Sequence, residues 1–158
     1  VLPCNDAEIR EIEVAQRIAL PAWYRAWLQL AGKCAGIFGI SSQFYPELVT
    51  LKDEAARLLK DITKNRLKLP NDAFVCCMDA EEFLFFSTND QSTDPPLTHY
   101  YIDNGEYRQI ESYWSLQMIN LQGLQAGARS SSMEFEFKRA HERCHALRRA
   151  VGGTENEK

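Results

Sequence analysis

The segment that most restricts the possible folds is Asp103-Asn104-Gly105, which lies between two runs of β-forming residues. An Asn-Gly pair readily adopts the left-handed backbone that a tight primed turn requires, and this turn joins antiparallel strands. The sequence therefore predicts a hairpin that is formed by Leu97–Ile102 and Tyr107–Ile110.

Two further strand-like runs precede this hairpin, Ala73–Asp79 and Phe83–Ser87. Both are short, rich in β-forming residues and apolar on both faces, which is typical of strands that are covered on two sides. Together with the hairpin they predict an antiparallel β meander of about four to five strands. The segments before and after the meander have helical patterns. The predicted fold class is therefore α+β, with the sheet partly wrapped by N- and C-terminal helices.

Two helices are predicted near the N-terminus. The first begins at a cap on Asn5 or Asp6 and ends near Arg17. The second lies within Ile18–Lys33 and begins at Pro21, because proline fits the first position of a helix. Its apolar face comprises Tyr24, Trp27, Leu28 and Ala31. We expect this face, and Trp27 above all, to be buried.

Further helices are predicted on both sides of the meander. A third helix begins at Thr50 and carries the apolar stripe Ala55, Leu58, Leu59 and Ile62. After the hairpin, Tyr113–Gln125 has a helical pattern, and a last helix spans 131–151. Residues 1–153 are expected to form a single domain, and residues 154–158 form a polar tail.

Composition limits the classes of function. A chain of 158 residues with 45% apolar content is long enough for one domain with a substantial core. A net charge of −4 argues against general nucleic-acid binding, which needs a basic face. No apolar run is long enough to span a bilayer, and the first residues lack the pattern of a secretory signal. Five cysteines without C-x-x-C spacing indicate reduced thiols. We expect a cytoplasmic protein that binds neither nucleic acid nor membranes.

One catalytic motif occurs literally, because His141-Glu142-Arg143-Cys144-His145 spells H-E-x-x-H. In zinc hydrolases the two histidines of this motif bind the metal and the glutamate activates water. Here Arg143 places a cation between the ligands, and both histidines fall about 100° from the apolar stripe of the predicted helix. Little chain follows to supply a third ligand. We therefore reject His141 and His145 as metal ligands and expect no zinc and no cofactor.

A nucleophilic cysteine is the other enzymatic possibility. Cys76 or Cys77 could lie near His99 on a neighbouring strand. Adjacent residues of a buried strand are far more often core than catalytic, however, and a nucleophile also needs access and an orienting third group. We therefore predict no catalytic residue.

The charges are strongly segregated. Between Leu69 and Tyr107 the chain carries eight acidic residues and no lysine or arginine. Most of these acids fall in the connections between strands, and the simplest interpretation is a solvated rim. The functional alternative is an anionic surface that attracts a basic partner. The candidate contact residues are Asp79, Glu81, Glu82, Asp90 and Asp94, together with Tyr100, Tyr101 and Tyr107.

The segment from Glu13 through Leu20-Pro21-x-x-Tyr24-x-x-Trp27-Leu28 to Gly32 resembles the entry signature of the SUKH superfamily. These Syd- and Knr-like proteins include fungal cell-wall regulators and bacterial toxin-immunity proteins. The second half is also similar, at Asp94-Pro95-Pro96-Leu97 and around Tyr113-Trp114, so that the resemblance covers about residues 8–122. The sequence departs from the pattern at Trp23, where the family has an acid, at Ala31-Gly32-Lys33, and in the added helix from Ser131.

The resemblance implies an α+β scaffold that binds a protein partner rather than an enzyme. Family members of the immunity type neutralise a toxin, commonly a nuclease, inside the cell that produces it. The acidic stretch is compatible with this role, because nuclease surfaces that hold phosphate are basic. A regulatory adaptor of the same fold is the alternative, and a zinc hydrolase that uses His141, Glu142 and His145 is a less favoured one.

Overall fold

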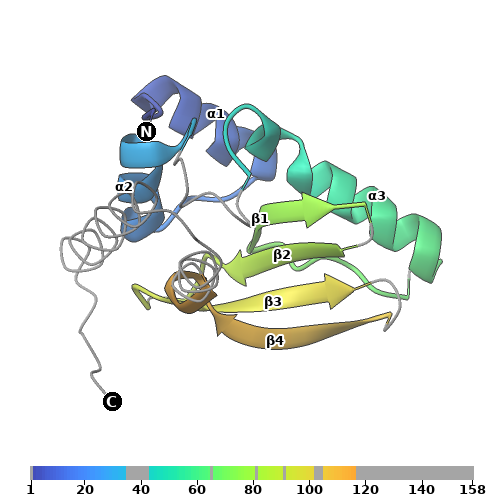
Figure 1. Cartoon of the computed structure of the whole chain (residues 1–158). Coiled ribbons are helices and arrows are strands. Elements are labelled where there is room, and N and C mark those ends of the chain that lie inside the picture. Colours follow the sequence, from blue (N-terminus) through green and yellow to red (C-terminus); the bar gives the residue numbers. More distant parts are fainter. Residues whose placement is uncertain are drawn as a thin grey trace, which may run out of the picture.

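The computed structural model describes residues 2–34, 43–64, 66–80, 82–90, 92–101 and 105–116. Within them, helices precede strands, as the sequence predicts, and the fold is α+β (Figure 1). The elements are α1 (Asp6–Gln16), α2 (Ala22–Ala31), the 3₁₀-helix η2 (Glu47–Val49), α3 (Leu51–Thr63), β1 (Ala73–Asp79), β2 (Glu82–Ser87), β3 (Pro96–Tyr101) and β4 (Glu106–Ser112). Residues 113–116 are also helical, and the predicted helices beyond them lie outside the described residues.

Helix α1 begins at the predicted cap. The Asn5 side chain accepts hydrogen bonds from the backbone N–H groups of Ala7 and Glu8, at 2.9 and 3.0 Å. The Glu8 carboxylate in turn accepts from the Asn5 N–H at 2.8 Å, which completes a capping box. The helix ends where Arg17 adopts a left-handed backbone, at φ 54°. The first predicted helix is therefore confirmed.

Helix α2 buries the predicted face, and Trp23 is buried beside it. Pro21 is the residue before the helix rather than its first residue. The helix ends at Gly32, where a Cβ would approach Cys4 Sγ to 2.5 Å and Leu28 O to 2.6 Å. Only glycine fits this close approach.

Helix α3 follows Thr50 as predicted, but the predicted cap does not form. The Thr50 hydroxyl donates to Glu47 O at 3.3 Å instead of accepting from the helix N-terminus. Of the predicted stripe, Ala55 and Leu59 are buried, and the remaining two residues are half-buried.

The strands form an antiparallel meander in the order β1-β2-β3-β4. Their bounds agree with the predicted runs to within two residues, and those of β1 agree at both ends. Gly105 has the positive φ (62°) that the predicted turn requires, while Asp103 and Asn104 lie outside the described residues. The sheet is thus a continuous ladder with β1 at one edge and β4 at the other.

The two faces of the sheet differ in what packs on them. One face, the covered face, carries Val75, Phe83, Phe85, Tyr100 and Tyr107. Helix α3 packs against β1, and the segment 66–71 runs along this face, where the Tyr107 hydroxyl donates to Lys68 O at 2.9 Å. The apolar side chains of this face are therefore largely excluded from water.

Of the described residues, those that cover the opposite face lie at one end of it only. There Phe74 and Phe86 pack beneath α2, with ring centroids 4.8 Å from Tyr24 to Phe74 and 5.2 Å from Trp23 to Phe86. Trp114, which follows β4, joins the same cluster through Trp23 at 6.0 Å. This aromatic cluster therefore connects α2, β1, β2 and the end of β4.

The free edge of β1 is closed by two glutamine side chains. The Gln16 amide donates to Val75 O at 3.0 Å and accepts from Val75 N–H at 2.9 Å, and it also donates to Leu48 O at 2.7 Å. Gln43 makes the same pair of bonds with Met78, at 2.9 and 3.0 Å. Each side-chain amide occupies the place that the backbone of a further strand would take, which protects the edge from pairing with another chain.

Replacing Trp27 with alanine should lower the free energy of unfolding by roughly 3–5 kcal/mol, because its buried ring packs against Trp114 at 5.6 Å. Urea unfolding followed by far-UV circular dichroism measures the loss. Leu30→Ala, at a position of the same helix that is 41% exposed, should be nearly neutral. Equal stability of the two variants would contradict this placement of the core.

Replacing Gln16 with leucine should lower the free energy of unfolding by about 3 kcal/mol or more, because buried backbone groups of Val75 and Leu48 lose their partner. The same unfolding assay applies. Gln29→Leu is the matched control, since Gln29 is exposed and bonds only the Asp6 side chain among the contacts described. A wild-type midpoint for Gln16→Leu would show that the amide contributes nothing to the β1 edge.

Candidate protein-binding surface

The end of the second face that no described helix covers, which we call the open face, is built from two rows of side chains that cross the sheet. The central row pairs Cys77, Leu84, His99 and Arg108 across the four strands. The acidic row pairs Asp79, Glu82, Tyr101 and Glu106 at the adjacent end of the strands. Because side chains alternate along a strand, both rows lie on one face.

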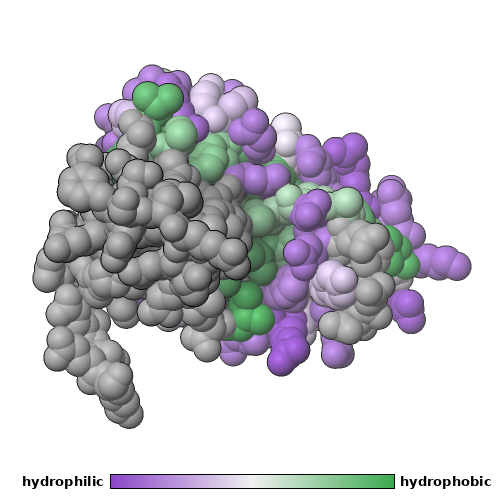
Figure 2. Space-filling view, in the orientation of Figure 1, coloured by the Kyte–Doolittle hydropathy of each residue, from purple (hydrophilic) through white to green (hydrophobic). Residues whose placement is uncertain are grey.

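A hollow of about 440 Å³ occupies the open face. Its apolar lining includes Leu84, Ile110 and Leu116, and its acidic margin includes Asp79 and Glu82. The space-filling view shows hydrophobic side chains over the strands, with hydrophilic residues to the right of them (Figure 2). The open face therefore combines an apolar centre with an acidic rim.

His99 holds the carboxylate of Glu82 in position. Its Nε2 lies 2.7 Å from a Glu82 oxygen, and its ring centroid is 5.9 Å from that of Tyr101. Both partners of the pair are partly exposed, with side-chain exposures of 27% for His99 and 41% for Glu82. A carboxylate fixed in this way can accept further hydrogen bonds from a basic group that approaches from solvent.

The structure brings together three of the predicted contact residues, Asp79, Glu82 and Tyr101. Glu81 lies outside the described residues. Asp90 and Asp94 lie in the connection between β2 and β3, at the opposite end of the strands from the acidic row. Asp90 accepts from Ser92 N–H at 2.8 Å and Asp94 accepts from Trp114 N–H at 3.0 Å, so both carboxylates order the local backbone.

The other two predicted tyrosines point to the covered face. Tyr100 is fully buried and stacks on Phe83 at 5.2 Å, so it cannot form part of an exposed contact surface. Tyr107 bonds the segment 66–71, and burial raises the pKa of its hydroxyl to about 12. Side chains alternate along a strand, so Tyr100 faces away from the side of its neighbour Tyr101, and Tyr107 faces away from the side of its neighbour Glu106.

Sequence reasoning missed several members of the open face. One of them, Glu106, belongs to the acidic row. The others each lie two residues along a strand from a member of that row, and they are Leu84, His99 and Arg108. The period of two, applied from Glu82 and Tyr101, would have selected Leu84 and His99.

The Cys77–His99 pair has the wrong geometry for an activated thiolate. Leu84 lies between them in the central row, and His99 directs Nε2 to Glu82. Burial, reinforced by the charges of Glu82 and Asp79, raises the pKa of Cys77 to about 11. A nucleophilic cysteine needs the opposite shift.

Neither a cluster of metal ligands nor a membrane-spanning helix is found among the described residues. Over the described ranges, no three histidine, cysteine or acidic side chains gather as metal ligands would. The motif that contains His141 and His145 lies outside these ranges, so its rejection stays a prediction. Within the same ranges, every helix is too short or too polar to cross a membrane.

The pKa of Cys77 predicts slow alkylation. A rise from the ordinary 9.0 to about 11 reduces the thiolate fraction near pH 8 about 100-fold, and the rate should then increase tenfold per pH unit up to about pH 11. Iodoacetamide labelling followed by mass spectrometry measures this rate, with Cys77→Ser to assign the signal. Labelling as fast as that of a free cysteine peptide at pH 8 would contradict the inference.

The described elements define a class of protein: an α+β domain whose antiparallel meander is covered on one face and partly open on the other. Residues 3–115 match the model of the SMI1 / KNR4 family (SUKH-1). The chain belongs to this family, which confirms the resemblance seen in the sequence. Comparisons with curated proteins and with solved structures find no match.

Proposed function

We propose that the protein is an immunity-type binder that neutralises a basic toxin domain by covering it with the open face. The observation that carries the proposal is the acidic row, three carboxylates from three strands set beside an apolar hollow. Membership of the SMI1 / KNR4 family supports a binding role, because the family includes immunity and regulatory proteins.

The charge of the open face favours a cationic partner. Asp79, Glu82 and Glu106 carry three negative charges, against one positive charge on Arg108. A nuclease toxin is a fitting partner, since the surface that holds its phosphate substrate is basic. Complementary potentials of this kind accelerate the encounter of two proteins more than they add affinity.

The apolar hollow supplies the hydrophobic contact surface that the charged residues lack. Leu84, Ile110 and Leu116 offer surface that a partner side chain can desolvate, and Tyr101 lies on the rim. Buried anchors at the centre of an interface usually dominate its affinity, while the surrounding polar residues exclude water. We infer that dissociation depends on this centre and association on the acidic row.

This mode of action places the protein in the cytoplasm of the producing cell, where the toxin must be held inactive. The toxin candidate is the product of a gene adjacent to the one that encodes the chain. Co-expression tests the proposal directly: cells that produce the toxin domain should survive only when this chain is present. Failure of the chain to protect or to bind any adjacent toxin product would contradict the immunity role and leave a regulatory adaptor.

Replacing Asp79 with asparagine and Glu82 with glutamine together should slow association with that toxin domain about tenfold at low salt, because steering is lost. Stopped-flow mixing over a range of salt concentrations measures the rate. The double variant should also show a flatter salt dependence, since exposed charges are screened within about 10 Å at 0.1 M.

The matched control is Glu47→Gln with Asp61→Asn, which removes the same charge from exposed positions on η2 and α3. Its association rate should fall much less than that of the open-face variant. Equal rates for the two double variants, at every salt concentration, would refute steering by the acidic row.

A further inference from the structure

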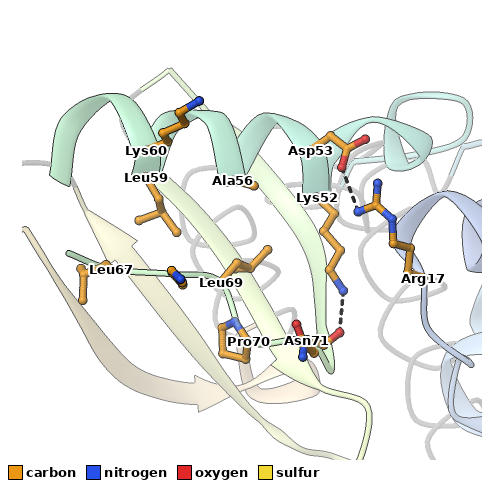
Figure 3. Close-up of a pocket in the computed structure, with 11 residues that line it drawn as sticks. Arg17, Lys52, Asp53, Ala56, Leu59, Lys60, Leu67, Leu69, Pro70 and Asn71 are labelled. Atoms are coloured by element: carbon orange, nitrogen blue, oxygen red, sulfur yellow. Dashed lines mark hydrogen bonds and ion pairs between the residues drawn. The ribbon is translucent and has the colours of Figure 1, made fainter. Parts of the chain in front are cut away.

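A second cavity lies on the covered side of the sheet, between α3 and the segment 66–71. It has a volume of about 510 Å³. Figure 3 shows the α3 side chains above and the segment that carries Leu67, Leu69, Pro70 and Asn71 below. The apolar part of its lining comprises Ala56, Leu59, Leu67, Leu69 and Pro70.

The charges around this cavity have the opposite sign to those of the open face. Arg17, Lys52, Lys60 and Lys68 line it, against a single acid, Asp53. The local charge is therefore +3, in a chain whose net charge is −4. Such a local reversal attracts an anionic ligand.

Lys52 is the residue that points most directly to a ligand. The residue is only 7% exposed, and its Nζ donates to Asn71 O at 2.8 Å (Figure 3). An ammonium group has three protons, and the described residues give this one no second acceptor. Burial, followed by the nearby charge of Arg17, lowers the pKa of Lys52. A carboxylate in the cavity would supply the missing acceptor and offset the cost of desolvation.

Arg17 is available to the same ligand. It pairs with Asp53 at 3.1 Å, but both side chains are largely exposed, at 68% and 62%. Exposed ion pairs of this kind contribute little to stability. A ligand carboxylate can therefore take over the guanidinium at small cost.

The cavity continues into a shallower groove between α1 and α3. The two share Arg17, Asp53, Ala56 and Lys60, and the groove adds Val14, an apolar residue that is 78% exposed. The groove also carries Arg57 and the acid Glu54, so that five basic and two acidic side chains line the two hollows together. The combined surface exceeds what a single small anion would occupy.

We propose that the cavity and groove dock an acidic segment of a second protein, with one carboxylate on Lys52 and Arg17 and apolar side chains over Leu67 and Leu69. The site is independent of the open face. The protein would then join a basic partner on one side of the sheet and an acidic peptide on the other.

The test uses a fluorescein-labelled peptide of eight residues that alternates glutamate and leucine, titrated with the full chain and followed by fluorescence anisotropy. We expect saturable binding to one site, and at least tenfold weaker binding of the peptide that carries lysine in place of glutamate. Lys52→Met should weaken binding at least tenfold, because a charge-assisted hydrogen bond is lost. Arg10→Met removes an equal charge from an exposed position outside the cavity and should leave binding unchanged.

Lys68→Gln provides a second variant in case Lys52→Met does not fold, and it should weaken binding several-fold because its side chain lines the cavity. The double variant Asp79→Asn with Glu82→Gln should bind the peptide as the wild type does. The outcome of the cavity test is therefore independent of the outcome of the open-face test. Equal binding of the glutamate and lysine peptides, equal loss in Lys68→Gln and Arg10→Met, or displacement of the peptide by equimolar octanoate would overturn the proposal. The last result would assign the cavity to a small carboxylate.

Discussion

The burial of aromatic rings between α2 and the sheet is the interaction on which the rest of the structure depends. Tyr24 packs on Phe74 of β1 and Trp23 on Phe86 of β2, while Trp114 closes the cluster from beyond β4. These contacts join segments that are distant in sequence, so the hydrophobic gain must offset the entropy of closing long loops. The cluster also covers only one end of its face, and among the described residues the other end of the strands forms the open face.

A second constraint acts at the edge of the sheet. Gln16 and Gln43 bond the backbone of β1 with their side chains, so α1 is attached to the sheet by hydrogen bonds as well as by packing. With that edge occupied, a partner cannot add a strand beside β1. The acidic row and the basic cavity lie on opposite sides of the same sheet, because α3 and the segment 66–71, which line the cavity, pack on the covered face.

The sequence was sufficient for most of the described elements of the fold, because the run of β-forming residues in β1 and the capping box at Asn5 are local signals. The candidate site was predicted only in part. Tyr100 and Tyr101 are neighbouring residues of the same type, so the sequence alone does not distinguish them. Only the packing of α3 and segment 66–71 decides which of the two is buried. Lys52 likewise has the pattern of an ordinary lysine in the first turn of a helix. Its burial depends on the carbonyl of Asn71, which no local pattern indicates.

The chain contains three tryptophans, and all of them belong to the aromatic cluster. Trp23 and Trp27 lie 6.0 and 5.6 Å from Trp114, so the indoles form one coupled chromophore. None of them lines the hollow of the open face or the cavity beneath α3. Intrinsic fluorescence therefore reports whether α2 is docked on the sheet and is locally insensitive to either binding surface. A change in tryptophan emission when a partner without tryptophan binds would mean that the core itself has rearranged.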